Sequence, residues 1–570
     1  MSCLVASVTC HPLTAMRIYL TRMVMVAASV AGGSAFAGEV SGVITDAESK
    51  PIKGAIVRVK DAETNLAETV YSDARGQFTL ETGMESDNLE LRVRAPYYRD
   101  QKGLISLQAD TQLEQKIVME RMTGDQEISD SLPAIFHFSK LPFEPGDDDE
   151  FNRADFQRDC AGCHQFGNAF TRWPRTAEQW IPTVKRMHGF MGNQDEAMIA
   201  RRAELLAKGY DGKPVMFRPD FEIDDVVLDA KIYEYALPGI IFPHDAEVSP
   251  EDGLVYTVDR HGYKMIVTNL ESGESRYVDQ PYSKTPLDSN GNGYTGRSNK
   301  PGPHSLSLGK NGLWYVTNAT SSSIGVFDAK KSQWSDEYVL PLPAHYPHTI
   351  RVDKQNIVWF TLAGSQQIGR IDPATDKITL INLPKQKALG IAATTTPYGI
   401  DINPVNGQVW FARLYADRIG YVVPDTLEVH EFDSPIKAPR RLRFDAQGQM
   451  WLTGYSEGMI ARINTDTMEH RIYPMPEFKD GYRPAPYALG VHPQTQEIWI
   501  NEVMTDHVYR LYPETGEFVA YPMPLRGTYT RDFSFTEDGW ACTANSPIPN
   551  AALEDFTAGL FCIDADGAVD

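Results

Sequence analysis

Hydrophobic and polar residues alternate in short runs along much of this 570-residue chain, and turn residues end each run. The stretches GAIVRVKDA, GQFTLETG and LELRVRAP, all within residues 38–122, have the period of two that is typical of half-buried strands. The turn sequence DARG separates two such runs. We therefore predict a small antiparallel β-sandwich over residues 38–122.

From about residue 231 the alternation becomes a repeat of 42 to 60 residues. Each of seven units opens with a stretch such as PHTIRVDKQNIVWFTL, and most continue into one such as IGRIDPATDKITLINLP. Four short strands in a unit of this length indicate a β-propeller, whereas an array of sandwiches is the alternative. The sequence predicts a mainly β fold, with a seven-bladed β-propeller over residues 231–570.

The two ends of the repeat complement each other. The seventh unit stops near LFCIDADGAVD without a fourth strand, while KIYEYALP, residues 231–238, precedes the first unit. We predict that this segment is the outermost strand of the seventh blade and closes the ring. Cys542 and Cys562 fall on the second and third strands of that blade. Neighbouring strands favour a disulfide between them, and two free buried cysteines are the alternative.

Residues 123–230 have helical periodicity instead. Thr176 and Gln179 form a capping-box pattern before the apolar positions of TAEQWIPTVKRMHGF. The stretch NQDEAMIARRAELLAKG predicts a second helix, with Gly209 as its C-cap. We expect a small helical domain between the sandwich and the propeller.

The N-terminus has the features of a cleaved signal peptide over residues 1–37. Arg17 and Arg22 precede a mostly apolar segment, and Ala35-Phe36-Ala37 is a typical cleavage site. Outside this region, no window approaches the ~18 apolar residues of a membrane span. We predict a periplasmic protein with no membrane span after cleavage. The net charge of −22 argues against nucleic acid as a partner.

The helical segment contains the stretch RDCAGCHQFGNAFTRWPR, in which Cys160, Cys163 and His164 form a C-x-x-C-H motif. Two cysteines at this spacing reach both vinyl groups of a haem, and the adjacent histidine binds its iron. A zinc site would need further ligands at zinc spacing, and a redox C-x-x-C would need a βαβ context. We therefore predict haem c. Candidates for the second iron ligand are Met187, His188, Met191 and Met198.

Three stretches of the chain resemble known families. The stretch GVITDAESKPIKGAIVRVKDAETNLAETVYSDARGQFTLE resembles the carboxypeptidase regulatory-like domain, which is usually an accessory module. The stretches CAGCH and WIPTVKRM resemble cytochrome c domains of periplasmic dehydrogenases, which implies Met187 as the second iron ligand. The stretch VWFTLAGSQQIGRIDPATDKITLINLP resembles the virginiamycin B lyase (streptogramin lyase) propellers.

Propeller topology gathers the residues that start the innermost strands around one mouth. These residues are His244, His304, His348, Tyr398, Arg440, Tyr487 and Arg531. The residues that end the second strands on the same face are Asp259, Asn318, Leu362, Arg413, Gly454, Glu502 and approximately Thr543. From these two sets we predict a site with catalytic and substrate-binding groups. The predicted catalytic residues are His244, His304, His348, Tyr398 and Tyr487, and the predicted substrate-binding residues are Arg413, Arg440, Arg531 and Asn318.

The chemistry of this site has two interpretations. The lyase resemblance implies an elimination assisted by Mg²⁺, and His304 and His348 match the family's histidine pair. The family's glutamate is missing, because Asn318 and Leu362 occupy the matching positions. Three histidines, His244 included, instead suit a second metal such as copper, iron or zinc. One of them could equally be a general base beside arginines that bind an anionic substrate.

We therefore predict an exported haem c oxidoreductase. It would oxidise a small polar or anionic substrate at the propeller mouth and pass electrons through the haem to a soluble periplasmic electron carrier. One alternative is a lyase of the virginiamycin B lyase type with an accessory haem. The other is a non-enzymatic electron-transfer or binding protein.

Overall fold

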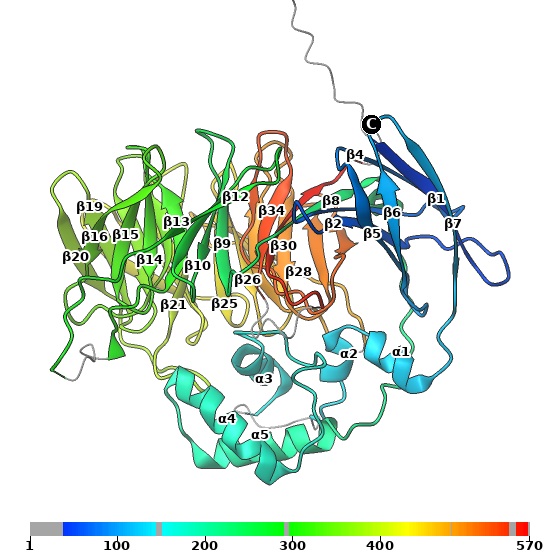
Figure 1. Ribbon diagram of the computed structural model, residues 1–570. Helices are drawn as coiled ribbons and strands as arrows, with labels where there is room; N and C mark the ends of the chain where they lie inside the picture. Colours follow the sequence, from blue (N-terminus) through cyan, green and yellow to red (C-terminus); the bar gives the residue numbers. More distant parts are fainter. Residues whose placement is uncertain (1–37, 144–150, 290–295, 480, 547–553, 568–570) are drawn as a thin grey trace, which may run out of the picture.

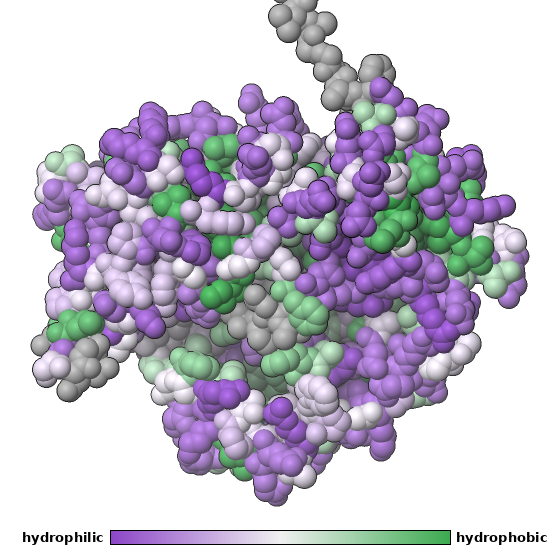
Figure 2. All heavy atoms as spheres, viewed as in Figure 1, coloured by the Kyte–Doolittle hydropathy of each residue, from purple (hydrophilic) through white to green (hydrophobic). Residues whose placement is uncertain are grey.

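The computed structural model describes residues 38–143, 151–289, 296–479, 481–546 and 554–567. The predicted signal peptide lies outside these residues. Helices form a layer across one end of a large set of strands, and the N-terminal strands stand beside that set (Figure 1). The visible face is largely hydrophilic, and hydrophobic side chains gather mainly over the N-terminal strands (Figure 2). No helix of the described residues is long and apolar enough to cross a membrane.

The N-terminal module consists of two sheets over a shared apolar core that includes Val40, Val57, Leu80 and Val93. One sheet has the order β4-β1-β7, and the strands β3-β2-β5-β6 form part of the other. The expectation of a purely antiparallel sandwich is wrong in one respect, because β1 pairs with β7 in parallel. The strands are β1 (Gly38–Asp46), β2 (Ile56–Asp61), β3 (Leu66–Tyr71), β4 (Gln77–Thr82), β5 (Ser86–Arg94), β6 (Gln101–Leu107) and β7 (Gln112–Met119).

The helical segment follows. Its elements are α1 (Asp125–Ser131), α2 (Ala134–Phe138), α3 (Arg153–Cys160), α4 (Ala177–Met191), α5 (Glu196–Gly209) and the 3₁₀ helix η1 (Asp225–Asp229). The predicted capping box of α4 is confirmed, because the Thr176 and Gln179 side chains each accept from the other residue's backbone N–H. Gly209 is the last helical residue rather than the cap, which is Tyr210. Glycine is required there for packing, since a Cβ would lie 2.6 Å from the Cδ2 atom of Leu141.

The repeat forms six four-stranded antiparallel sheets and a seventh group, β33-β34-β35-β8. The strands of the first three sheets are β9 (Pro243–Val248), β10 (Val255–Asp259), β11 (Lys264–Thr268) and β12 (Ser275–Asp279); β13 (Pro303–Leu308), β14 (Leu313–Asn318), β15 (Ser323–Asp328) and β16 (Gln333–Val339); and β17 (Pro347–Val352), β18 (Val358–Leu362), β19 (Gln367–Asp372) and β20 (Lys377–Asn382). Those of the next three are β21 (Pro397–Ile402), β22 (Val409–Arg413), β23 (Arg418–Val422) and β24 (Val429–Asp433); β25 (Pro439–Phe444), β26 (Gln449–Gly454), β27 (Met459–Asn464) and β28 (His470–Pro474); and β29 (Pro486–Val491), β30 (Ile498–Glu502), β31 (His507–Leu511) and β32 (Phe518–Pro522). The seventh group contains β33 (Ser534–Phe535), β34 (Ala541–Asn545), β35 (Gly559–Asp564) and β8 (Lys231–Ala236).

Burial follows the order of strands within each sheet. The six longer innermost strands begin with a buried proline, whose missing N–H costs nothing at the first position of a strand. Second strands are buried throughout or nearly so, and fourth strands are the most exposed. Neighbouring innermost strands contact one another from β9 to β29, and β33 and β34 contact β9. The mainly β, propeller-like fold predicted from the repeat is confirmed.

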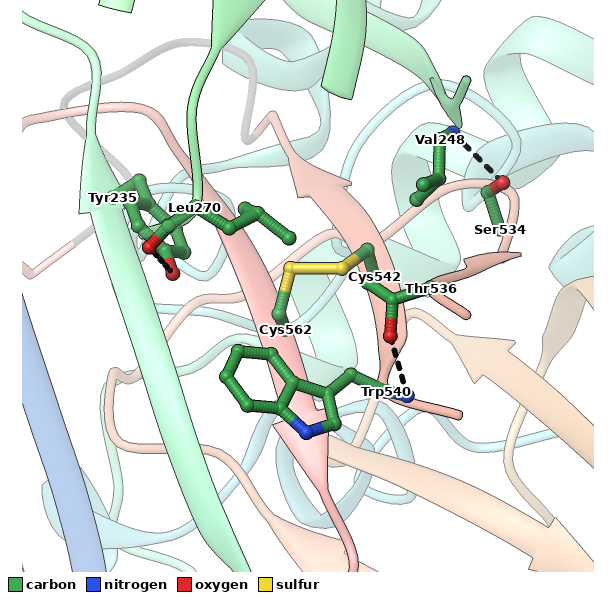
Figure 3. The surroundings of a disulfide bond; sticks show 8 residues. All are labelled: Tyr235, Val248, Leu270, Ser534, Thr536, Trp540, Cys542 and Cys562. Atoms are coloured by element: carbon green, nitrogen blue, oxygen red, sulfur yellow. Dashed lines mark hydrogen bonds between the residues drawn. A yellow bond between two sulfur atoms is a disulfide. The ribbon is translucent and has the colours of Figure 1, made fainter. Parts of the chain in front are cut away.

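The expected closing segment, residues 231–238, contains β8, which pairs antiparallel with β35. Its other edge pairs with β3 of the N-terminal module, so that the seventh blade continues into an eight-stranded sheet. Cys542 and Cys562 lie directly opposite each other on β34 and β35 and form a disulfide (Figure 3). Trp540 stacks on Tyr233 of β8 with 4.5 Å between ring centroids. The disulfide therefore joins the last two strands to each other, while strand pairing and ring stacking join them to β8.

Candidate functional site at the propeller axis

The seven residues that start the innermost strands are brought together at the axis, and each is only 1% to 7% exposed. The imidazole rings of His244, His304 and His348 lie in succession, tilted to one another, with 3.6 and 4.0 Å between neighbouring centroids. The ring of Tyr398 follows at 3.8 Å from that of His348. One side of the axis is therefore a continuous row of three imidazoles and a phenol.

Tyrosine and arginine form the other side. The hydroxyls of Tyr398 and Tyr487 lie 2.8 Å apart. Arg440 donates from Nη2 to the Tyr398 hydroxyl at 2.7 Å, and Arg531 donates from Nη1 to the Tyr487 hydroxyl at 2.7 Å. The guanidinium of Arg440 also lies 3.9 Å from the ring centroid of Tyr487. Arg440 thus contacts both tyrosines, and Arg531 bonds Tyr487.

The same groups hold the backbone of the C-x-x-C-H motif. Arg440 donates from Nη2 to the Gly162 carbonyl at 2.8 Å. Tyr455 and Tyr529 both donate to the Ala161 carbonyl, the latter at 3.1 Å, and Arg531 approaches the Cys163 carbonyl at 3.5 Å. The motif therefore caps the axis directly, at the end where the innermost strands begin. This contact links positions more than 270 residues apart, and the repeat pattern contains no signal for it.

The residues of the motif fit a covalently attached haem. Cys160 ends α3, Cys163 is exposed, and neither forms a disulfide. The Nδ1 atom of His164 lies 3.1 Å from the Gln165 carbonyl, and burial lowers the pKa of the imidazole. A neutral histidine whose N–H donates to a carbonyl presents its Nε2 lone pair to a metal. Exposed apolar side chains of the same segment, available to cover a macrocycle, are Phe170, Trp173 and Phe190.

The four candidates for the second iron ligand have different surroundings. His188 is buried, and its Nε2 atom lies 3.3 Å from Nη1 of Arg202, which also pairs with Asp159. Met191 and Met198 pack against the hydrophobic core of the helical segment. Met187 is half-buried on α4 and is not part of that core. Hydrogen bonding or core packing thus occupies the other three candidates, and Met187 stays the predicted second iron ligand.

The three axial histidines differ at Nδ1. His244 bonds Asp245 at 2.9 Å, and His348 bonds Thr349 at 2.9 Å. Nδ1 of His304 is buried and finds no hydrogen-bond partner among the described residues. Burial, helped by neighbouring arginines and imidazoles, lowers the pKa of all three well below the usual value. At neutral pH the three imidazoles are therefore uncharged.

Asp245 is a member of the site that the sequence pattern did not reveal. Arg441 holds it bidentately at 2.9 Å, and although burial opposes ionisation, this arginine lowers the pKa of Asp245. In a regular strand, the residue after His244 would point away from the axis. The pairing of β9 with β10 instead shifts register near its start, as it does in the next five sheets. This irregularity brings consecutive residues to the axis, and period-two reasoning overlooks them.

Tyr487 has the most unusual electrostatic setting of the ring. Burial alone would raise its pKa, but Arg531, Arg440 and Arg441 outweigh burial and lower the pKa to about 8. Its neighbour Tyr398 responds in the opposite sense, since burial raises its pKa well above the usual value. One phenol of the pair is therefore poised to ionise near physiological pH.

Two predicted substrate-binding residues make other contacts. Arg413 is buried and bonded to Thr395, Glu431 and the Pro384 carbonyl. Asn318 bonds Gln280 and Ser323, at 3.1 Å each. Both side chains brace neighbouring strands and loops of their own blades.

Across the described ranges, no group of three or more His, Cys, Asp or Glu side chains is arranged to hold a metal ion, so the second metal remains only a prediction.

Comparison with known proteins gives the following matches. Residues 39–120 match the family model of the carboxypeptidase regulatory-like domain. Virginiamycin B lyase from Staphylococcus aureus is similar in structure at 20% identity and a TM-score of 0.47, covering 59% of this chain and 99% of the lyase. A streptogramin B lyase is 20% identical with a TM-score of 0.49, and the match covers 60% of this chain and 100% of the lyase. Kuenenia stuttgartiensis hydrazine synthase is 13% identical with a TM-score of 0.41, and the match covers 54% of this chain and 94% of that chain. No curated protein matches the chain.

Fold and family match together define the class of the molecule. It is a mainly β, propeller-like protein whose N-terminal module is a carboxypeptidase regulatory-like domain. A layer of short helices with the C-x-x-C-H motif covers the axial site (Figure 1).

Proposed function

We propose that the protein is an exported haem c oxidoreductase that oxidises a small polar or anionic substrate at the propeller axis. The observation that supports this most is the shared hydrogen bonding of Arg440 and Arg531. Each reaches a carbonyl of the C-x-x-C-H motif and a tyrosine of the axial ring. A redox group on this motif would therefore adjoin the ring of basic and phenolic groups.

Cys160 and Cys163 would hold the haem through thioethers, with His164 and Met187 as iron ligands. When bound, the haem supplies a centre that takes up and releases single electrons. A soluble periplasmic electron carrier is the proposed partner. The exposed side of Cys163 and its apolar neighbours would give such a carrier access to the haem edge.

The protein's own groups supply proton transfer and binding. His244 is the proposed general base, because ionised Asp245 fixes the Nδ1–H tautomer and leaves Nε2 free to accept the substrate proton. His304 has a buried Nδ1 without a partner in the described structure, and a polar substrate group would satisfy it. The unpaired Nε and Nη1 atoms of Arg440, which have no partner among the described residues, offer positive charge to an anionic substrate.

The first test is covalent haem in protein isolated from the periplasm. We expect a haem-stained band of the full chain that Cys160→Ala abolishes. Small 2-hydroxy acids, alcohols and amines are then offered anaerobically while the haem absorption bands are followed. The correct class should reduce the haem, and His244→Ala or His304→Ala should slow reduction at least ~100-fold with an unchanged spectrum. His470→Ala, on an exposed outer strand, is the matched control.

The lyase alternative predicts a different outcome. It would give Mg²⁺-dependent elimination with no change in haem oxidation state, and His304→Ala would abolish it. A haem that no substrate in the panel reduces, together with such an elimination, would replace the proposed function.

A further inference from the structure

The opposite end of the axis has a cavity of its own. It lies where the innermost strands end and has a volume of about 300 Å³. The charged lining residues are Asp245 and Glu247 of β9, Arg351 of β17, Arg443 of β25 and Asp532. The rings of Phe444 and Phe535 contribute apolar walls. The cavity is thus amphipathic, and it meets the axial site at Asp245, which bonds His244.

The charged groups around the cavity are matched except for one. Asp532 pairs with Arg351, Arg441 and Arg443, and two further carboxylates complete the balance. These are Asp245, on Arg441, and Asp401, 3.5 Å from Arg351. Three guanidiniums therefore face three carboxylates, and Glu247 is a fourth acid.

Glu247 makes no ion pair or hydrogen bond within the described residues. Burial raises its pKa to about 7, with Arg351 and Arg443 opposing and Asp532 and Asp245 reinforcing the rise. Below pH 7 this carboxyl therefore exists largely as a neutral acid, which donates a hydrogen bond rather than repelling an anion.

The two arginines of the lining have donors to spare. Arg443 donates from Nη1 to the Leu442 carbonyl at 2.7 Å and from Nη2 to Asp532. A guanidinium carries more N–H donors than these two bonds use. Arg351 donates from Nη1 to the Ile350 carbonyl at 2.7 Å, and its Nη2 reaches Asp532 only at 3.5 Å. Burial beside Arg351 lowers the pKa of Arg443, which indicates that further negative charge would be stabilising here.

We propose that this cavity binds a small organic monocarboxylate with an apolar body. The ligand carboxylate would lie between Arg351 and Arg443 and accept a hydrogen bond from protonated Glu247, while its body contacts Phe444 and Phe535. Arginine forks suit carboxylates, and a buried acid paired with a carboxylate shares one proton. A small organic ammonium ion fits less well, because it would face two guanidiniums.

Proton linkage follows from this geometry. An anion beside Glu247 favours its neutral form, so binding takes up a proton above the pH at which the free carboxyl ionises. Affinity should therefore fall as pH rises through 7, approaching tenfold per pH unit above that point. The cavity shares only Asp245 with the groups to which the proposed oxidation assigns a role.

Calorimetry on the full-length holoprotein tests this, with benzoate as the probe and benzamide and benzylamine as comparisons. We expect benzoate to bind about tenfold more tightly at pH 6 than at pH 8, with proton uptake at the higher pH. Glu247→Gln keeps a neutral donor, so it should preserve binding and remove the pH dependence. Exposed Glu251→Gln is the matched control and should leave both unchanged. His304→Ala should not affect binding, which separates this site from the catalytic proposal.

Arg443→Gln should weaken benzoate binding at least tenfold. Because this change also disturbs the Asp532 cluster, Val491→Trp provides a second variant that fills the cavity and leaves all charges in place. It should abolish binding in protein with an unchanged melting temperature. Preference for benzylamine, equal affinity for benzoate at both pH values, or no benzoate binding at millimolar concentration would overturn the proposal.

Discussion

Tyr487 should ionise about two pH units below an ordinary tyrosine, and this can be measured directly. Its hydroxyl accepts a hydrogen bond from Arg531 at 2.7 Å, and the Arg440 guanidinium lies 3.9 Å from its ring. These arginines lower its pKa to about 8, whereas buried tyrosines elsewhere in the axis, such as Tyr455 and Tyr529, have raised pKa values. The protein should therefore contain one phenolate near pH 8.5.

The magnitude of the arginine effect follows from the hydrogen bond. A bond between a charged donor and its acceptor contributes about 1.5–3 kcal/mol. One pKa unit corresponds to 1.36 kcal/mol. Replacing Arg531 by methionine keeps most of the side-chain volume and should raise the pKa of Tyr487 by about one to two pH units.

Absorbance at the phenolate band between pH 6.5 and 10 provides the assay. The difference between wild type and Tyr487→Phe isolates one tyrosine and removes the haem contribution. Arg413→Met, which alters a buried arginine with no contact to Tyr487, is the control. The electrostatic reasoning fails if the wild type shows no transition below pH 9, or if Arg531→Met leaves the transition where it was.

Three further predictions concern stability. As pH falls below about 6.5, the unfolded chain binds protons at the three axial histidines while the native chain does not. The free energy of unfolding should therefore fall by up to about 4 kcal/mol per pH unit for three imidazoles. Melting curves at pH 7.5 and 5.5 test this, and His304→Asn should remove about a third of the loss. Replacing Cys542 and Cys562 by alanine opens a loop of 20 residues and should lower the opening free energy of the β35 amides by about 3 kcal/mol, measured by hydrogen exchange. Wild-type protein with its disulfide reduced should show the same decrease. Arg441→Met removes the arginine partner of buried Asp245, whereas Asp532 keeps its pairs with Arg351 and Arg443. The change should cost about 3–5 kcal/mol in denaturant unfolding, and a loss below about 1 kcal/mol would contradict the importance of the Arg441–Asp245 pair.

The propeller-like fold could be predicted from the sequence because seven similar units each predict the same short strands. Alternation and turn residues agree from unit to unit, and six of the seven units have a proline at the inner-strand start, so errors in one unit are corrected by the others. The residues facing the axis were accessible for the same reason. Asp245 and Arg441 were not, because the register shift at each inner-strand start breaks the alternation on which that prediction rests.

At the second-strand positions, the sequence assigned residues to the site whose side chains make other contacts. Arg413 and Asn318 occupy equivalent places in their repeats, and equivalence suggested a shared function. Their actual partners, Glu431 and Gln280 among them, lie on segments that differ from blade to blade. A repeat fixes the position of the Cα atom, but the contacts of a long polar side chain depend on residues that are specific to each blade.

The N-terminal module illustrates a boundary that sequence alone places too sharply. Residues 39–120 form a recognisable unit with its own core, yet β3 pairs with β8 and extends the seventh blade. Arg58 of β2 forms a buried ion pair with Glu234 of β8 and also pairs with Asp555, so charged contacts join the module to the seventh group of strands. The module is thus a fixed extension of the propeller rather than a tethered one.

The contact between the helical segment and the axis has a consequence for any assay of the site. Arg440 and Arg531 join the axial tyrosines to the backbone of the C-x-x-C-H motif, so changing either arginine alters the ring and the motif together. Variants of the imidazole row are more selective, because His244, His304 and His348 make no hydrogen bond to the motif within the described structure. Loss of turnover in a histidine variant with an intact haem spectrum would therefore locate the defect in proton transfer. The same loss in an arginine variant would leave haem placement and substrate binding as joint causes.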